Sequence, residues 1–153
     1  MKTLEINLDD FLTAMESSGL LGYLDIQSGE VINLFEDEME VFSEEDEEYE
    51  EYLLLSKKIE ENEENRYLEI PHISSHEAFE HMEEFVDTVI NAKLREQLVQ
   101  ALSGKKVFRV FKDVINDYPQ ERQQWFDFKN DKMKQYAKSW LEDIGIELEQ
   151  ESL

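Results

Sequence analysis

The chain has 153 residues, with 38 Asp and Glu against 15 Lys and Arg, a formal net charge of −23 and no cysteine. The absence of cysteine excludes disulfides, thiolate nucleophiles and cysteine-ligated zinc sites, and the net charge opposes direct binding to nucleic acids and anionic membranes. Hydrophobic residues still make up 41% of the chain, enough for the core of one domain, and no apolar run reaches the ~18 residues of a membrane span. We therefore expect a cytoplasmic protein that does not enter membranes.

The charge is unevenly distributed along the chain. Residues 1–70 hold 22 acidic and 4 basic residues, whereas residues 104–140 hold 5 acidic and 9 basic residues. The basic segment has two interpretations: it lies against the acidic part of the fold and lowers self-repulsion, or it forms a cationic patch for a partner. Internal neutralisation is the simpler interpretation, because most charge runs are solvated faces.

The first 35 residues predict a short helix and a β-hairpin. Apolar residues recur at helical spacing from Leu8 to Met15, and Asn7 is a suitable N-cap. Two apolar runs, at residues 20–26 and 31–35, flank a Gln-Ser-Gly sequence. Two such runs around a turn sequence are typical of a hairpin.

The most acidic part of the chain predicts another helix. Residues 44–51 contain seven acids in eight positions, and like charges one turn apart weaken a helix. Ser43 as an N-cap and an apolar stripe nevertheless favour a helix from about residue 43 to 61. The stripe consists of Tyr49, Tyr52, Leu53 and Ile59. Residues 66–70 then alternate in polarity and stop at Pro71, which predicts a third strand.

The C-terminal half predicts a series of helices and a final short strand at residues 146–148. The boundaries that we expect are a capping box at Ser74 and Glu77, a break at Asn91, a stop at Ser103-Gly104, a start at Pro119 and a break at residues 128–130. The chain therefore predicts an α+β fold: a small antiparallel sheet, made of the hairpin and the third strand, packed against several α-helices, with a mostly helical C-terminal half. We expect a single α+β domain over residues 1–153, with an acidic region (1–70), a helical region (71–145) and a tail (146–153).

The motifs of common catalytic and nucleotide sites are absent from the chain, including the phosphate-binding glycine loop, the serine nucleophile elbow and the His-Glu-x-x-His zinc helix. His76 and Glu80, one helical turn apart, are weak candidates for a metal site. Solvation of an exposed helix start is the simpler explanation, because a metal site needs ligands from more than one element. We expect no cofactor and no metal, and the missing motifs argue against an enzyme.

The acidic run at residues 44–51 has three interpretations. Calcium binding is disfavoured, since the run lacks the short ligands and the turn glycine of a calcium loop. Carboxylates in a row can also imitate a nucleic-acid backbone and compete for a basic groove of another protein. The simplest interpretation is that the acids only confer solubility.

Residues 108–113 interleave aromatic and basic side chains. If exposed, the rings could stack on bases while Arg109 and Lys112 hold phosphates. In a helix, Phe108, Phe111 and Ile115 form a buried stripe with basic flanks. We favour the helix, because aromatic residues at helical spacing are usually part of a core.

Several blocks of the chain, taken in order, resemble a bacterial family. The blocks are Tyr23-Leu24-Asp25 with Gly29-Glu30-Val31, Arg66-Tyr67-Leu68-Glu69-Ile70-Pro71, Met82-Glu83-Glu84-Phe85, Phe108-Arg109-Val110-Phe111-Lys112-Asp113, Trp125-Phe126-Asp127-Phe128 and Trp140-Leu141. They extend over residues 20–146, and the ordered set is similar to uncharacterised protein family 0158. The resemblance implies a bacterial cytosolic protein and implies no activity.

The family blocks supply a candidate functional surface. Its residues are Arg66, Glu69, Arg109, Lys112, Asp113 and Trp125. Arg66 and Glu69 are three residues apart on a strand and point to opposite faces, so we do not expect them to share one site.

A polar and aromatic cleft is our hypothesis for this surface. Arg109, Lys112 and Asp113 occupy adjoining helix positions, and Trp125 has a neighbouring phenylalanine, so one of the two rings is left for a rim. Arg66 would complete the cleft. The competing hypothesis pairs Arg109 and Lys112 with acids of the hairpin.

Three functions remain open on the sequence alone. The first is a non-enzymatic acidic protein-binding or regulatory module that engages another protein through its mixed-charge helical face. The second is an acidic nucleic-acid mimic that engages a basic DNA- or RNA-binding protein, which requires the carboxylates of residues 44–64 on one ordered surface. The third is a small enzyme or nucleotide binder that uses Arg109, Lys112 and Asp113, which requires a concave pocket at those side chains.

Overall fold

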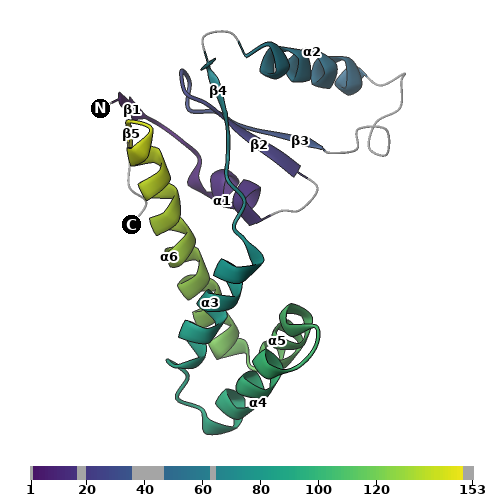
Figure 1. Cartoon of the computed structure of the whole chain (residues 1–153), viewed down its shortest axis with the longest axis vertical. Coiled ribbons are helices and arrows are strands. Elements are labelled where there is room, and N and C mark those ends of the chain that lie inside the picture. The colour runs from purple at the N-terminus through teal and green to yellow at the C-terminus, as the bar shows by residue number, and fades with distance from the viewer. Residues whose placement is uncertain (1, 17–19, 36–46, 63–64, 150–153) are drawn as a thin grey trace. The chain divides into compact units, whose positions relative to one another are not determined.

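The computed structural model describes residues 2–16, 20–35, 47–62 and 65–149, and the chain divides into two compact units (Figure 1). We call Met1–His72 with Tyr136–Leu153 the sheet unit and Ile73–Gln135 the helical unit. The sheet unit holds β1 (Lys2–Leu4), α1 (Leu8–Glu16), β2 (Leu20–Asp25), β3 (Val31–Phe35), α2 (Glu47–Glu61), β4 (Tyr67–Glu69) and β5 (Ile146–Leu148). The helical unit holds α3 (Ser75–Val86), α4 (Ala92–Ser103) and α5 (Val107–Asn116), and α6 (Pro119–Asp143) runs from this unit into the sheet unit.

The predicted hairpin and third strand form one antiparallel sheet in the order β3-β2-β4. Leu24 of β2 pairs with Val31 of β3 on one side and with Leu68 of β4 on the other. In the hairpin turn Gly29 has a φ of 84°, a left-handed conformation that glycine adopts without steric cost. The expected α+β class, with its small antiparallel sheet and mostly helical C-terminal half, is confirmed.

Helix α1 begins as predicted, because Asn7 Oδ1 accepts a backbone N–H of the first turn at 3.1 Å. Phe11 is fully buried, and α1 lies so close to β2 that a Cβ at Gly22 would stand 2.6 Å from the Cβ of Ala14. A glycine at position 22 therefore permits this close approach of helix and strand. The predicted end of the helix at residues 17–19 lies outside the described residues.

The acidic helix is present as α2, and its apolar side joins a cluster with the sheet. The cluster consists of Ile59 from α2, Ile32 and Leu34 from β3 and Tyr67 from β4, with Tyr52 and Leu55 of α2 packed against it. Leu53, which we expected in this stripe, is 41% exposed. Positions 52, 55 and 59 share one helix face, whereas position 53 lies about 100° away from position 52. The predicted N-cap Ser43 lies outside the described residues.

The predicted strand at residues 146–148 is confirmed as β5, and its partner is β1 at the other end of the chain. The two strands are parallel, with Lys2 opposite Ile146 and Leu4 opposite Leu148. Nothing in the local pattern of residues 2–4 predicts this pairing, because a parallel ladder joins segments that are distant in sequence.

Helix α3 begins at the predicted cap, since Ser74 Oγ accepts the Glu77 N–H at 3.1 Å. The predicted break at Asn91 is confirmed, because Asn91 lies between two helices in an extended conformation, and the break begins earlier than expected. Helix α3 already ends at Val86, and Asn91 is the N-cap of α4, where its Oδ1 accepts two N–H groups of the first turn, each at 3.1 Å. Asparagine disfavours a helix interior for the same reason that it favours an N-cap, because its side chain competes for backbone N–H groups.

The predicted break at residues 128–130 is wrong, because α6 continues without interruption for 25 residues. Phe128 packs inward, with its ring 5.6 Å from that of Phe85. The segment contains neither glycine nor proline, which would break a helix. The packing of Phe128 against the core stabilises the helical conformation of the segment. Pro119 occupies the first helical position as predicted.

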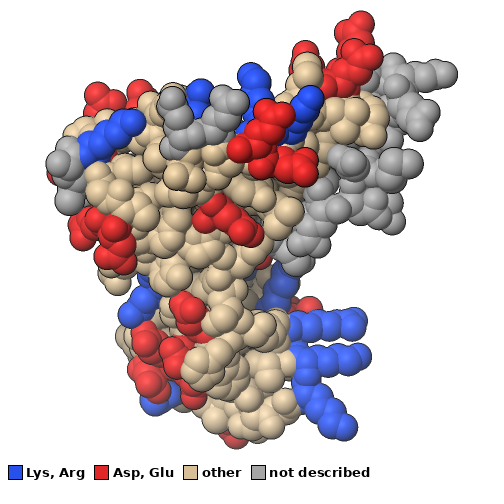
Figure 2. Space-filling model, turned by 45° about the horizontal axis from the view of Figure 1, so that its top comes forward, with Lys and Arg blue, Asp and Glu red and all other residues tan. Residues whose placement is uncertain are grey.

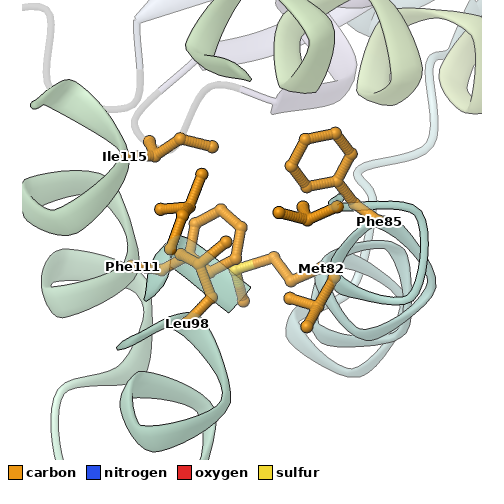
Figure 3. Close-up of a cluster of buried hydrophobic side chains, with 8 residues drawn as sticks. Met82, Phe85, Leu98, Phe111 and Ile115 are labelled. Carbon is orange, nitrogen blue, oxygen red and sulfur yellow. The ribbon is translucent and has the colours of Figure 1, made fainter. Parts of the chain in front are cut away.

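The core of the helical unit is apolar and aromatic. Its buried members are Met82, Phe85, Val86, Val89, Leu94, Leu98, Phe111 and Ile115. Figure 3 shows Met82 and Phe85 of α3 pointing across this core toward Leu98 of α4 and toward Phe111 and Ile115 of α5. Within the described ranges, no helix has both the length and the apolar character that a bilayer span requires.

Candidate functional site

The six residues of the predicted surface belong to different units. Arg66 and Glu69 lie in the sheet unit, whereas Arg109, Lys112, Asp113 and Trp125 lie in the helical unit. Each unit therefore has its own candidate site, built by its own elements.

Arg66 is bound to a carboxylate that the sequence did not single out as functional. Its Nε and Nη2 donate to Oδ1 and Oδ2 of Asp25 at 2.9 and 2.7 Å, a fork that matches the two carboxylate oxygens. Asp25 stands at the end of β2 with a side chain only 3% exposed, and its Oδ1 also accepts the Gln27 N–H at 2.9 Å. The Ile26 N–H donates to the Arg66 carbonyl at 3.0 Å. The pair thus ties the end of β2 to the start of β4.

The electrostatics of the pair indicate a structural role. The Arg66 guanidinium holds the pKa of the Asp25 carboxyl well below its usual range, with help from the turn N–H groups and against the effect of burial. Asp25 in turn raises the pKa of Arg66. A general base at neutral pH needs a pKa of about 7, so its pKa would be shifted in the opposite direction. An Asp at the end of an otherwise apolar strand was the sequence signal for this site.

Glu69 has a different neighbour. It lies on β4 directly opposite Tyr23 of β2, and its side chain is exposed. Burial first, and then the charge of Glu69, raises the pKa of Tyr23. Arg66 and Glu69 therefore interact with separate partners.

The solvent side of α5 carries the basic segment. We call Lys105, Lys106, Phe108, Arg109 and Lys112 the α5 face, because the side chains of all five are exposed. Phe108 is 49% exposed, which corrects our assignment of this ring to the buried stripe. Its position lies about 60° around the helix from that of Phe111, at the edge of the buried side.

The cations of the α5 face make no ion pair with any residue that the structure describes. Figure 2 shows Lys and Arg side chains projecting from the helical unit on the side where Figure 1 places α5. In contrast, Lys132 of α6 binds Glu84 of α3 at 2.8 Å and lowers the pKa of that carboxyl. Internal neutralisation therefore applies to Lys132 and not to the α5 face within the described chain.

Trp125 packs against the aromatic core beside α5. Its ring is half-buried and lies 5.1 Å from Phe111 and 5.3 Å from Phe85. The neighbouring Phe126 is 38% exposed, with Arg122 and Lys129 over its ring at 5.5 and 5.3 Å. Trp125 thus holds α5 in place, and Phe126 is the exposed ring of the two.

The weak metal candidates form only a local pair. His76 Nε2 lies 2.9 Å from Glu80 Oε1, one turn apart on α3, and both side chains are largely exposed. The described residues contain no group of three or more side chains placed to hold a metal ion. The nucleic-acid mimicry hypothesis needs the carboxylates of residues 44–64 on one surface. Residues 44–46 lie outside the described residues, and α2 exposes Lys57 and Lys58 as well as glutamates.

Arg109, Lys112 and Asp113 are exposed on α5. The grooves at α4 and at β5 are lined by other residues. The nucleotide-binding alternative therefore has no observation in its favour from these grooves.

The comparisons with known proteins agree with the resemblance stated above. The chain matches the family model "Uncharacterised protein family (UPF0158)" over residues 4–152. It is 30% identical over 147 residues to a UPF0158 protein of Pseudomonas aeruginosa strain PAO1, and the alignment covers 96% of this chain and 88% of that protein. No solved structure matches the chain.

Proposed function

The chain belongs to the uncharacterised protein family UPF0158, and we propose that it is a non-enzymatic binding module of the bacterial cytoplasm that engages an acidic partner protein. The proposed binding surface is the α5 face. Asp113 borders this surface, and Arg66 is left out of it because Asp25 already occupies its guanidinium.

The observation that carries the proposal is a set of four cations that have no acidic partner among the described residues, in a chain of net charge −23. A folded chain with a large surplus of carboxylates lowers its energy when its cations lie beside them. Lys105, Lys106, Arg109 and Lys112 instead face solvent. Such a patch attracts an acidic surface over about one Debye length, ~10 Å at 0.1 M salt.

The chemistry of the α5 face suits a protein partner. Arg109 can bind a carboxylate through its planar guanidinium group. Lys112, three residues further along α5, supplies a second positive charge. Phe108 adds an aromatic ring beside them, the type of residue that anchors many interfaces. Asp113, one turn beyond Arg109, would repel an acidic partner at one edge and so define its position.

The experiment compares two charge-reversed variants of the tagged protein in extracts of the native host. In the first, Arg109→Glu and Lys112→Glu reverse the α5 face. In the matched control, Lys57→Glu and Lys58→Glu make the same change of charge at exposed positions of α2. We expect the wild type and the control to recover the same acidic protein at low salt, and the α5 variant to lose it.

The recovered protein is then purified and titrated against each variant. We expect the α5 variant to weaken binding by at least ~tenfold, about 1.4 kcal/mol, and added salt to weaken wild-type binding in parallel. Equal affinity of the α5 variant and the control would contradict the proposal. A basic nucleic-acid-binding protein that both variants recover at least as well as the wild type would point to the mimicry function instead, because both variants add acidic side chains.

A further inference from the structure

The solvent side of α4 carries an apolar groove that is separate from the α5 face. Ile90, just before α4, is 97% exposed, the highest value among the large hydrophobic residues that the structure describes. Val99 on α4 is 48% exposed. Both border a groove of about 490 Å³ whose lining is Ile90, Ala92, Arg95, Glu96, Val99 and Gln100.

Ile90 takes no part in the core of its own unit. The core position in the connection between α3 and α4 belongs to the preceding residue, Val89, which is 6% exposed. Contact with water disfavours an apolar side chain, and exposed apolar patches with polar borders mark interaction sites. The side chain of Ile90 is therefore available for contact with another molecule.

The charges beside the groove have opposite signs on its two sides. Ala92 and Val99 are seven residues apart, about two turns, so they lie in one row along α4. Arg95 lies about 60° to one side of Ala92 around the helix axis, and Glu96 about 40° to the other side. A two-fold axis parallel to α4 would bring the two rows together and place Arg95 of each copy beside Glu96 of the other.

We propose that this face is a dimer interface, in which two copies of the chain pack their α4 helices in parallel about such an axis. Ile90 and Val99 of the two copies then bury one another, and two symmetric ion pairs form at the borders. Among the residues that the structure describes, Arg95 pairs only with Asp87 of its own chain, at 3.9 Å and with both side chains largely exposed, so this contact competes weakly. The inference does not depend on the function proposed for the α5 face.

The net charge of the unit favours a second copy as the occupant. The helical unit carries 11 acidic and 10 basic residues, a net charge of −1, whereas the sheet unit carries 27 and 5, a net charge of −22. Two copies that meet through their helical units therefore meet through the parts of the chain that repel each other least. A strongly charged partner would gain little from this groove.

The first test measures the dimer dissociation constant by sedimentation equilibrium on the full chain. We expect Ile90→Lys to raise it by at least ~tenfold, and the melting curve to stay unchanged at high dilution, because Ile90 is outside the core. Leu54→Lys is the matched control, since Leu54 is 65% exposed on α2, and it should dimerise as the wild type does. A monomeric wild type, or equal dimerisation of Ile90→Lys, would overturn the proposal.

The second test uses the symmetry. Arg95→Glu and Glu96→Arg should each weaken the dimer, whereas the double variant should restore it, because both ion pairs are then formed with their signs exchanged. An equimolar mixture of the two single variants should give a heterodimer. If the double variant is as weak as the single variants, the parallel two-fold arrangement is refuted.

Discussion

The sheet unit and the helical unit use different means to reach a folded state. Nearly all the net charge resides in the sheet unit, −22 against −1 in the helical unit. The sheet unit also contains Asp25, the one buried charged side chain among the described residues, whereas the core of the helical unit consists of apolar and aromatic side chains. The acidity of the whole chain is therefore a property of one unit, and it says little about the surface of the other.

The largest effect is expected in the helical core. Phe111 is 2% exposed and contacts Trp125, so Phe111→Ala should lower the free energy of unfolding by about 3–5 kcal/mol through a cavity. The matched change Phe108→Ala, at a half-exposed position of the same helix, should cost under ~1 kcal/mol. Urea denaturation of both variants checks the difference. Equal losses would mean that Phe108 is part of the core after all.

The next effect tests the polar tie of the sheet unit. Asp25→Asn removes the charge that binds Arg66, and we expect a loss of about 2 kcal/mol at pH 7. Because the folded state lowers the pKa of Asp25, the stabilisation by Asp25 is complete above the unfolded pKa of about 4 and is lost as the pH falls toward the folded pKa.

The measurement for Asp25 is therefore the urea midpoint at pH 7 and at pH 3. Between pH 7 and pH 3 the wild type should lose more stability than Asp25→Asn. The difference between their urea midpoints should therefore be smaller at pH 3. A gap that is constant with pH would show that the charge of Asp25 contributes nothing.

An effect of similar size concerns the contact of α1 with β2. Gly22→Ala should lower stability by about 1–3 kcal/mol, since the new Cβ would meet the Cβ of Ala14. Ala14→Gly removes that obstacle, so the double variant should be less destabilised than the sum of the two single variants. Strict additivity of the two losses would rule out this contact as the reason for the glycine.

The smallest effect tests whether the two units unfold together, as a single domain would. Each unit holds one tryptophan, Trp125 in the helical unit and Trp140 in the sheet unit. The variants Trp125→Phe and Trp140→Phe leave one fluorescent probe in either unit. Because α6 runs through both units, we propose one transition, with the two probes and circular dichroism agreeing in each variant within about 0.5 kcal/mol. Separate transitions would identify two domains.

The candidate sites show how far a local pattern can be trusted. The adjoining positions of Arg109 and Lys112 were predictable, because neighbours on a helix follow from a period of 3.6 residues. The exposure of Phe108 was not predictable. Helical periodicity places Phe108 at one edge of the apolar side of α5, and only the packing of α5 in the fold decides which edge of that side is buried. The same limit applies to Leu53 on α2.

The sequence by itself determined the class of the fold, the hairpin, the caps at Asn7 and Ser74, and the concentration of acids in the first part of the chain. Each of these depends on residues within one or two turns of each other, whose conformational preferences act locally. Only the tertiary structure decided that Arg66 binds Asp25, that β1 pairs with β5, and that α6 runs unbroken through residues 128–130. These outcomes depend on segments that are distant in the chain, and their energies come from packing and burial, which no local pattern contains.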